Sequence, residues 1–149
     1  MRVRGIDAVG NLGIWKYSRV FSTTLLEEDD ASVTYTGKWL TGSVAASSNG
    51  QSAKSFAANA TATVEFEGSS IAWISALSAT RGLAEVSIDG VYVETVDLYR
   101  ANASGAMSVF SYSGLSRTGT HTLTVRVLGQ GQLLSTGTAI VIDSFIIGQ

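Results

Sequence analysis

The sequence predicts an all-β fold, an antiparallel β-sandwich of about eight strands. Three observations predict it. From about residue 32 onward, short stretches alternate apolar and polar residues and are separated by Gly, Asn or Ser. The dipeptide Asp89-Gly90 stands between two of these stretches. No window shows the i, i+3, i+4, i+7 spacing of an amphipathic helix. At 149 residues, the chain has the length of one domain.

The stretch 61–67 is the clearest predicted strand. Ala62, Val64 and Phe66 occupy every second position between polar residues. Because successive side chains of a strand point to opposite faces, this spacing places the three on one buried face. The next stretch, 71–77, is nearly all apolar, so we expect a strand that is covered on both faces.

Asp89-Gly90 predicts a tight hairpin between the stretches 84–88 and 91–93. Both central positions of a type I′ turn require positive φ, which Asp and Gly tolerate better than most residues. We therefore expect two adjacent antiparallel strands here.

Three further strands are expected toward the C-terminus, at 107–112, 120–128 and 139–147. The last is apolar on both faces apart from Asp143 and Ser144, so we expect it in the middle of a sheet. Residues 45–53, AASSNGQSA, are small and mostly polar, and predict a loop within the domain.

Several short motifs, in order along the chain, resemble one family. They are GKW at 37–39, ATATVEFEGSSIAWI at 60–74, TRGLAEVSIDGVYVETVDLY at 80–99, THTLTVRVLG at 120–129 and VIDSFIIG at 141–148. Together they resemble the galactose-binding-like jelly-roll domains that bacteria append to secreted glycoside hydrolases, esterases and cell-surface proteins. The resemblance covers about residues 22–149. It implies a jelly-roll sandwich used mostly as a carbohydrate-binding module or accessory domain.

Residues 1–20 have a different character from the rest of the chain. VRGIDAVGN at 3–11 is similar to the last strand of bacterial immunoglobulin-like or fibronectin type III modules. We therefore divide the chain into residues 1–20, an N-terminal arm or the remnant of a preceding module, and residues 21–149, the sandwich. The alternative is that 1–20 form an ordinary strand or arm of the same domain.

Charge and composition narrow the range of partners. The net charge is −2 and no Lys/Arg cluster appears, so nucleic acid is not an expected partner. Cysteine is absent, which excludes disulfides and thiolate chemistry. No stretch of about 18 apolar residues occurs, so we expect no membrane insertion.

The sequence lacks the residue combinations that catalysis requires, so we expect no enzymatic activity. The single histidine, His121, is in phase with Leu123 and Val125 at the start of a strand, which favours an inward, structurally bonded side chain. There is no nucleophile elbow, zinc motif or phosphate-binding loop. Paired carboxylates could serve a glycosidase, but the glutamates at 65, 67, 85 and 94 fall in the polar phase of strands and Asp89 in a turn.

Acidic residues near the first and last strands favour one metal, calcium, in a structural role. Calcium prefers carboxylate oxygens, and in related jelly rolls acids at these two places bind it. Glu28 and Asp30 lie in the run 27–30, and Asp143 is the lone acid of the last strand, where it needs a partner or a ligand. The alternatives are a hydrogen-bonded Asp143 and a solvated acidic loop, and no other cofactor is expected.

Sugar binding requires aromatic faces and a few orienting polar groups. Trp39, Tyr99 and Tyr112 lie near strand ends or loops, and Arg81 lies in a loop where it could bind hydroxyls or a uronate. These four are the predicted carbohydrate-binding residues, although packing explains each aromatic equally well. Trp73 alternates in phase with its apolar neighbours and is predicted to be core.

The function expected from the sequence is that of a non-catalytic carbohydrate-binding or targeting module of an extracellular bacterial protein. Its partners would be a polysaccharide or glycan and the neighbouring domains of a longer parent chain. The alternative is a structural or protein-interaction sandwich in a surface, adhesin or phage-tail-like assembly. The mean hydropathy of +0.23 is compatible with contacts in a homo-oligomer.

Overall fold

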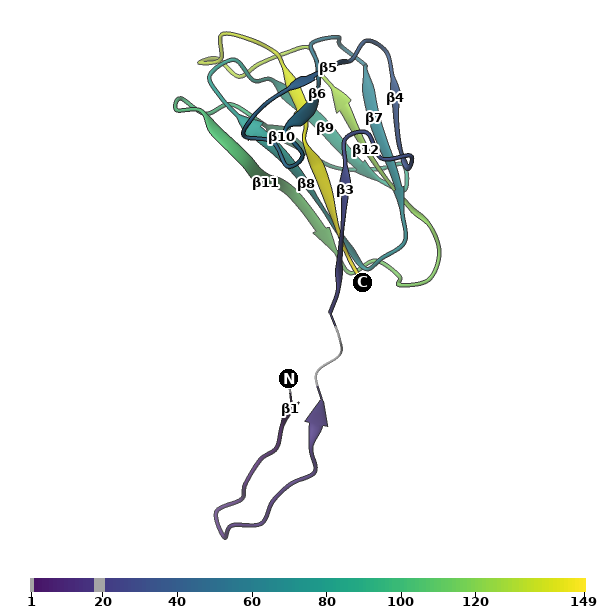
Figure 1. Ribbon diagram of the computed structural model, residues 1–149, viewed down its shortest axis with the longest axis vertical. Helices are drawn as coiled ribbons and strands as arrows, with labels where there is room; N and C mark the ends of the chain where they lie inside the picture. Colours follow the sequence, from purple (N-terminus) through teal and green to yellow (C-terminus); the bar gives the residue numbers. More distant parts are fainter. Residues whose placement is uncertain (1, 18–20) are drawn as a thin grey trace.

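A computed structural model describes residues 2–17 and 21–149, and its main body is a sandwich of two antiparallel sheets (Figure 1). The five-stranded sheet has the order β10-β9-β12-β7-β4 and the four-stranded sheet the order β11-β8-β14-β3. The predicted all-β sandwich is confirmed. The strands of the first sheet are β4 (Val33–Thr36), β7 (Thr61–Phe66), β9 (Leu83–Ile88), β10 (Val91–Asp97) and β12 (His121–Val127). Those of the second are β3 (Thr23–Glu27), β8 (Ser70–Leu77), β11 (Ser104–Ser113) and β14 (Ser144–Gly148).

The core lies between the two sheets and is built from alternate positions of their strands. On β7, Ala62, Val64 and Phe66 are buried, which confirms the period of two predicted for that strand. Trp73 of β8 and Phe145 of β14 fill the core from the opposite sheet and have no solvent exposure. The placement of Trp73 in the core is therefore also confirmed.

The hairpin predicted at Asp89-Gly90 joins β9 to β10. Asp89 has φ 51° and Gly90 φ 78°, the positive values that a type I′ turn requires. The strands pair antiparallel from Val91 opposite Ile88, with a register shift between Tyr92 and Glu94. The prediction is confirmed in position and in backbone conformation.

The two apolar stretches, 71–77 and 139–147, differ from each other in how neighbouring strands and side chains cover them. The last predicted strand, 139–147, is divided in two. Its second part, β14, lies between β8 and β3, which confirms a central position for residues 144–147, whereas residues 140–142 form the edge strand of a smaller sheet. Strand β8 is also interior to the sheet, but only every second residue is fully buried. Its prediction as a strand covered on both faces was wrong, because the outward-facing Ala72, Ile74 and Ala76 remain partly exposed.

A third, smaller sheet lies beside the sandwich and consists of β5 (Leu40–Ser43), β6 (Gln51–Ser55) and β13 (Ile140–Ile142) in the order β13-β6-β5. Asp143 separates β13 from β14, so the chain changes sheets at this residue. The loop predicted at 45–53 is shorter than expected, because residues 51–53 pair within β6.

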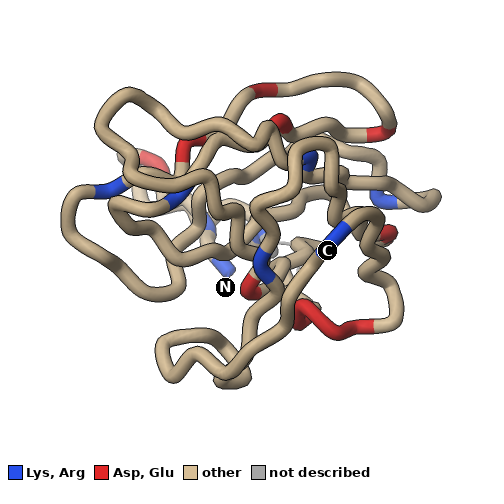
Figure 2. Tube along the Cα trace, turned by 90° about the horizontal axis from the view of Figure 1, so that it is seen from above, with Lys and Arg blue, Asp and Glu red and all other residues tan. Residues whose placement is uncertain are grey.

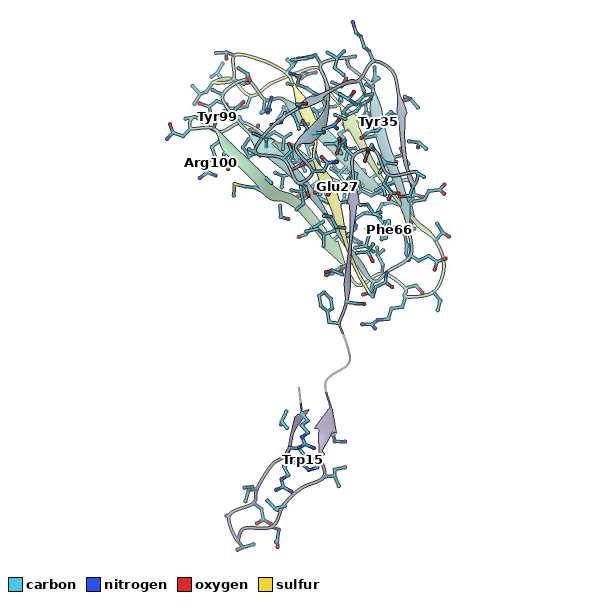
Figure 3. All side chains as sticks on the ribbon, in the orientation of Figure 1. Trp15, Glu27, Tyr35, Phe66, Tyr99 and Arg100 are labelled. Carbon is cyan, nitrogen blue, oxygen red and sulfur yellow. The ribbon has the colours of Figure 1, made fainter. Side chains whose placement is uncertain are left out.

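The N-terminal residues form a separate hairpin, β1 (Arg2–Val3) with β2 (Lys16–Tyr17). Figures 1 and 3 show it apart from the sandwich, with Trp15 at its centre. The guanidinium groups of Arg2 and Arg4 lie 4.4 and 4.6 Å from the Trp15 ring centroid. The boundary predicted at residue 20 falls at 18–20, outside the described residues. Nowhere in 2–17 and 21–149 is there a helix that is long and apolar enough to cross a membrane.

Candidate functional site

A groove runs along the small sheet and consists of two adjoining hollows of about 210 and 260 Å³. Together they reach the size of small-ligand sites, roughly 300–1,000 Å³. The first is lined by Leu40, Thr41, Gly42, Ser43, Val44, Ser52, Lys54, Ala76, Arg81 and Val141. The second is lined by Lys38, Leu40, Lys54, Ser55, Phe56 and Ala57. Leu40 and Lys54 border both hollows, so the two adjoin at these side chains, and we refer to them together as the groove.

Strand pairing explains why these side chains share one surface. Leu40 of β5 lies opposite Lys54 of β6 in the antiparallel register, so both side chains stand on the same face of the small sheet. Phe56 follows two positions after Lys54, and the Lys54 ammonium lies 5.4 Å from its ring centroid. Leu40 is 49% exposed and Phe56 50%. The groove therefore offers apolar surface directly beside a cation.

The charged side chains of the groove are all basic. Arg81 enters the first hollow from the β8–β9 loop and is half-buried, and its Nε donates a hydrogen bond to the carbonyl oxygen of Ala76 at 3.0 Å. Burial lowers the pKa of Arg81 below its usual value. Lys38 and Lys54 are the other charged residues of the lining, which contains no Asp or Glu. The arrangement suits a ligand that combines an apolar face with acceptor groups.

The structure does not bring the four predicted sugar-binding residues to one surface. Arg81 lines the groove, whereas Trp39 is half-buried, packs on Tyr35 at a centroid distance of 5.0 Å, and donates from Nε1 to the carbonyl of Thr36 at 3.0 Å. Tyr99 lies beyond β10, where its backbone bridges Ser78 (Figure 3).

Tyr112 lies at the opposite end of β8 from the loop that carries Arg81. It pairs with Ile71 at the start of β8, six residues before the strand ends at Leu77, and this corresponds to roughly 20 Å. There it lines a separate hollow with Phe21. Of the four predicted residues, Arg81 is therefore the one that contributes to the groove.

Sequence reasoning missed Lys38, Leu40, Lys54 and Phe56. A signal for two of them was present: Lys54 and Phe56 alternate with Ala53 and Ser55, the period of a strand with one outward face. The interpretation of residues 45–53 as a loop concealed the strand. The proximity of Arg81 could not be predicted, because it depends on which loops meet at one end of the sandwich.

The predicted calcium ligands separate into two groups. Asp30 accepts hydrogen bonds from the backbone and hydroxyl of Ser32 at 2.8 and 2.7 Å, so its carboxylate is engaged in a local turn. Glu28 and Asp143, in contrast, are 2% and 1% exposed, and each has one buried oxygen without a hydrogen-bond partner. The acidic run 27–30 is the continuous red stretch in Figure 2.

At Ser48, Asp143 meets Glu27, an acid that had not been predicted. The backbone N–H of Ser48 donates to Asp143 at 2.9 Å, and its hydroxyl donates to Glu27 at 2.8 Å. Glu27 also has a buried oxygen without a partner, and burial raises the pKa of Glu28. Such unpaired hard oxygens fit calcium. Across the described residues, however, no three acids, His or Cys already surround one point, so a cation would have to draw these side chains together.

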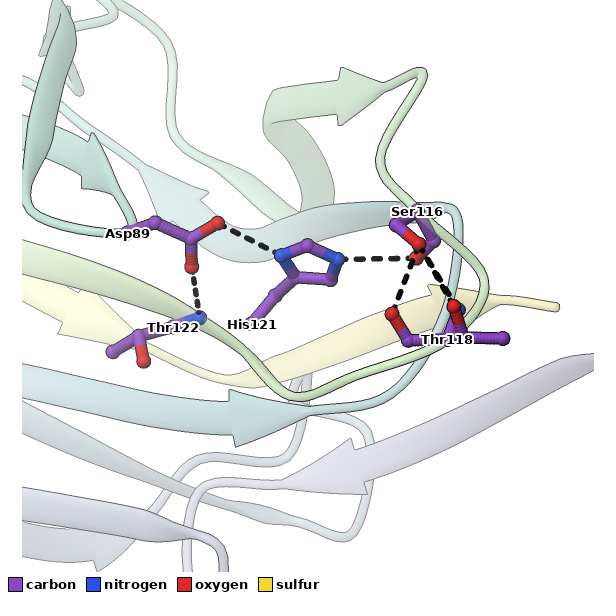
Figure 4. A network of polar contacts seen from close by, with 5 residues as sticks. All are labelled: Asp89, Ser116, Thr118, His121 and Thr122. Carbon is purple, nitrogen blue, oxygen red and sulfur yellow. Dashed lines mark hydrogen bonds and ion pairs between the residues drawn. The ribbon is translucent and has the colours of Figure 1, made fainter.

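His121 takes part in a network of polar contacts (Figure 4). Its Nδ1 lies 2.8 Å from Oδ2 of Asp89, and its Nε2 lies 3.0 Å from the carbonyl oxygen of Ser116. The Ser116 hydroxyl donates elsewhere, to the carbonyl of Thr118 at 2.9 Å. A serine hydrolase needs the hydroxyl, not the carbonyl, at the histidine nitrogen. The histidine is thus structurally bonded, as predicted.

Comparison with known proteins gave similarity in structure alone. No family model matches the sequence, and no curated protein does. A xanthan lyase from Paenibacillus superposes with a TM-score of 0.62 at 17% identity, over 81% of this chain and 12% of the lyase. A two-domain esterase active on acetylated mannans gives a TM-score of 0.62 at 17% identity, over 86% of this chain and 37% of the esterase.

An exo-β-1,3-galactanase from Phanerochaete chrysosporium gives a TM-score of 0.58 at 19% identity, over 91% of this chain and 30% of the enzyme. The likeness shows the fold. This β-sandwich is found within several larger carbohydrate-active enzymes, and the chain spans well under half the length of each. Identities this low carry no information about which residues bind or react.

Proposed function

We propose that the chain is a non-catalytic carbohydrate-binding module, and that the groove along β5 and β6 is its binding site. One observation carries the proposal: Leu40 and Lys54 line both hollows, where they are joined by Arg81 in the first and by the exposed ring of Phe56 in the second. Apolar surface accepts the C–H face of a pyranose, and cationic donors bind its hydroxyl or carboxylate oxygens. The occurrence of the fold in polysaccharide-active enzymes supports this proposal.

Affinity electrophoresis in gels that contain a panel of plant, bacterial and host polysaccharides tests the proposal. The expected result is retarded migration with at least one polysaccharide and its loss in Phe56→Ala. Tyr112→Ala is the matched control, since it also removes an exposed aromatic ring but from the hollow at the far end of β8. Unretarded migration in every gel, or equal effects of both variants, would contradict the proposal.

The wider setting proposed for this module is an extracellular bacterial protein of several domains. The resemblance of its ordered motifs to appended jelly rolls supports this setting, and so does the length of the enzymes that share its fold. We also propose that Glu28 and Asp143, joined by Glu27 in place of Asp30, bind a structural calcium ion. The three unpaired carboxylate oxygens near the Ser48 loop support this assignment.

A second candidate function is that of an assembly domain, and the N-terminal hairpin favours it. Val3, Ile6, Leu12 and Ile14 are all more than half exposed, and two-stranded hairpins alone are marginally stable in water. If the hairpin is an assembly element, the whole chain forms oligomers and a chain that lacks residues 1–17 is a monomer. Light scattering after size exclusion distinguishes these states, and a monomeric whole chain would exclude self-assembly.

A further inference from the structure

The cations of the groove have no acidic partners within the protein. Among the described residues, ion pairs join His121 to Asp89 and Arg126 to Glu85, and neither involves the groove. Arg81 is half-buried, and burial of a charge without a partner is unfavourable. Its terminal nitrogens donate no hydrogen bond to the described residues. The groove therefore holds a guanidinium to which no carboxylate of residues 2–17 and 21–149 is paired.

The loop that carries Arg81 holds the side chain in place. The Arg81 N–H donates to the carbonyl of Ser78 at 3.2 Å, and its own carbonyl accepts from the Ser135 hydroxyl at 2.6 Å. The Nε bond to Ala76 fixes the plane of the guanidinium at the other end. Because little freedom remains to be lost, an arriving anion meets a preorganised donor.

The second cation of the hollow lies on a different element. Lys54 projects from β6 between the two hollows, and the pairing of β6 with β13 holds that strand in place. Lys38 adds a third positive charge at the far end of the groove. Although the chain carries a net charge of −2, the three charged residues that line the groove are all positive.

From these features we infer that the ligand is an anionic sugar, a uronic-acid residue within a polysaccharide. Its carboxylate binds Arg81 and Lys54 in the first hollow, where the C–H face of the ring lies on Leu40. A planar carboxylate matches the two terminal nitrogens of a guanidinium, whereas a neutral sugar would leave this half-buried charge unpaired. The inference rests on the proposed carbohydrate-binding function and specifies the ligand class of the same groove.

The test compares polysaccharides that differ in charge alone. Isothermal titration of the whole chain is carried out with polygalacturonate and with its fully methyl-esterified form, each at low and at 0.5 M salt. We expect the ester to bind about 10- to 100-fold more weakly than the acid, because it lacks one charged hydrogen-bonding partner. We also expect the acid to bind more weakly at high salt than at low salt. Equal binding of acid and ester would overturn the inference and leave the proposed function intact.

Three substitutions and one further probe, dextran sulfate, complete the test. Arg81→Gln is expected to bind polygalacturonate about 10- to 100-fold more weakly, and Arg117→Gln, which removes an exposed cation from another loop, to bind as the parent does. Lys54→Gln provides a second substitution in the same hollow should Arg81→Gln fold poorly. Preference for dextran sulfate over polygalacturonate would overturn the assignment to carboxylates. If the chain binds neither these polymers nor any other polysaccharide, the proposed function itself is overturned.

Discussion

The Nδ1 atom of His121 lies 2.8 Å from Oδ2 of Asp89, and this contact ties the start of β12 to the β9–β10 turn. The other carboxylate oxygen of Asp89 accepts the backbone N–H of Thr122 at 2.8 Å. Since Nε2 of His121 faces the carbonyl oxygen of Ser116, both ring nitrogens face acceptors (Figure 4). The arrangement stabilises the protonated imidazole.

The first prediction concerns the pH dependence of stability. The hydrogen bond to Asp89 raises the pKa of His121, and the hydrogen bond to His121 lowers the pKa of Asp89. The contribution of His121 to the stability of the fold is complete below the ordinary pKa of about 6.5, and it is lost as pH rises through the raised pKa. The contribution of Asp89 to the stability of the fold is present above the ordinary pKa of about 3.9, and it is lost as pH falls through the lowered pKa.

The parent should therefore exceed His121→Gln in melting temperature most clearly near pH 5.5, and the difference should shrink by pH 8.5. Thermal unfolding followed by circular dichroism at both pH values measures it. Arg117→Gln, a cation of the same loop region, serves as the control and should show a difference that does not vary with pH. A gap between parent and His121→Gln that stays constant would refute the assignment.

The second prediction concerns Trp73, whose side chain is fully buried and donates from Nε1 to the carbonyl of Val141 at 3.2 Å. Trp73→Ala should lower the free energy of unfolding by about 3–5 kcal/mol, because it leaves a large cavity between the sheets. Trp73→Phe should cost less, since the ring fills part of the space and the Ser75 hydroxyl still donates to Val141 at 2.7 Å. Urea titration measures both, and equal losses would show that the cavity is not the cause.

The third prediction uses two glycines with opposite surroundings. A Cβ atom at Gly82 would lie 2.5 Å from the carbonyl oxygen of Thr138 and 2.7 Å from that of Gln130. Backbone atoms cannot yield as a flexible side chain does, so Gly82→Ala should lose about 1–3 kcal/mol of stability. At Gly42 a Cβ would meet no atom within 4 Å, and Gly42→Ala should change stability by less than about 0.5 kcal/mol. Similar urea midpoints for both variants would contradict the prediction.

The fourth prediction concerns calcium and the carboxylates beside Ser48. Calcium that binds the folded chain alone should raise the melting temperature of a protein first treated with chelator. Glu28→Gln and Asp143→Asn should weaken this rise, because each replaces a charged ligand by a neutral amide. Asp30→Asn is the matched control, as that side chain is occupied by Ser32. A melting temperature that does not respond to calcium would exclude the ion at this site.

Much of the fold could be predicted because the signals that specify a strand are local. The alternation along β7 places Ala62 and Val64 on the buried face, and Asp89-Gly90 identifies a hairpin by its positive φ. The apolar character of β14 likewise indicates a central strand. For β8 the same reasoning failed, because an apolar outer face does not reveal whether a further layer covers it.

The sequence by itself determined the strands of the sandwich from residue 61 onward, the tight hairpin and the burial of Trp73, because each depends on residues next to one another along the chain. Only the tertiary structure decided that Arg81, Lys54 and Leu40 border one groove, that Tyr112 lies at the opposite end of β8, and that Asp143 meets Ser48. The physical reason is that periodicity fixes the face to which a side chain points. Strand order and loop packing fix its neighbours, and these depend on residues that are distant in the sequence.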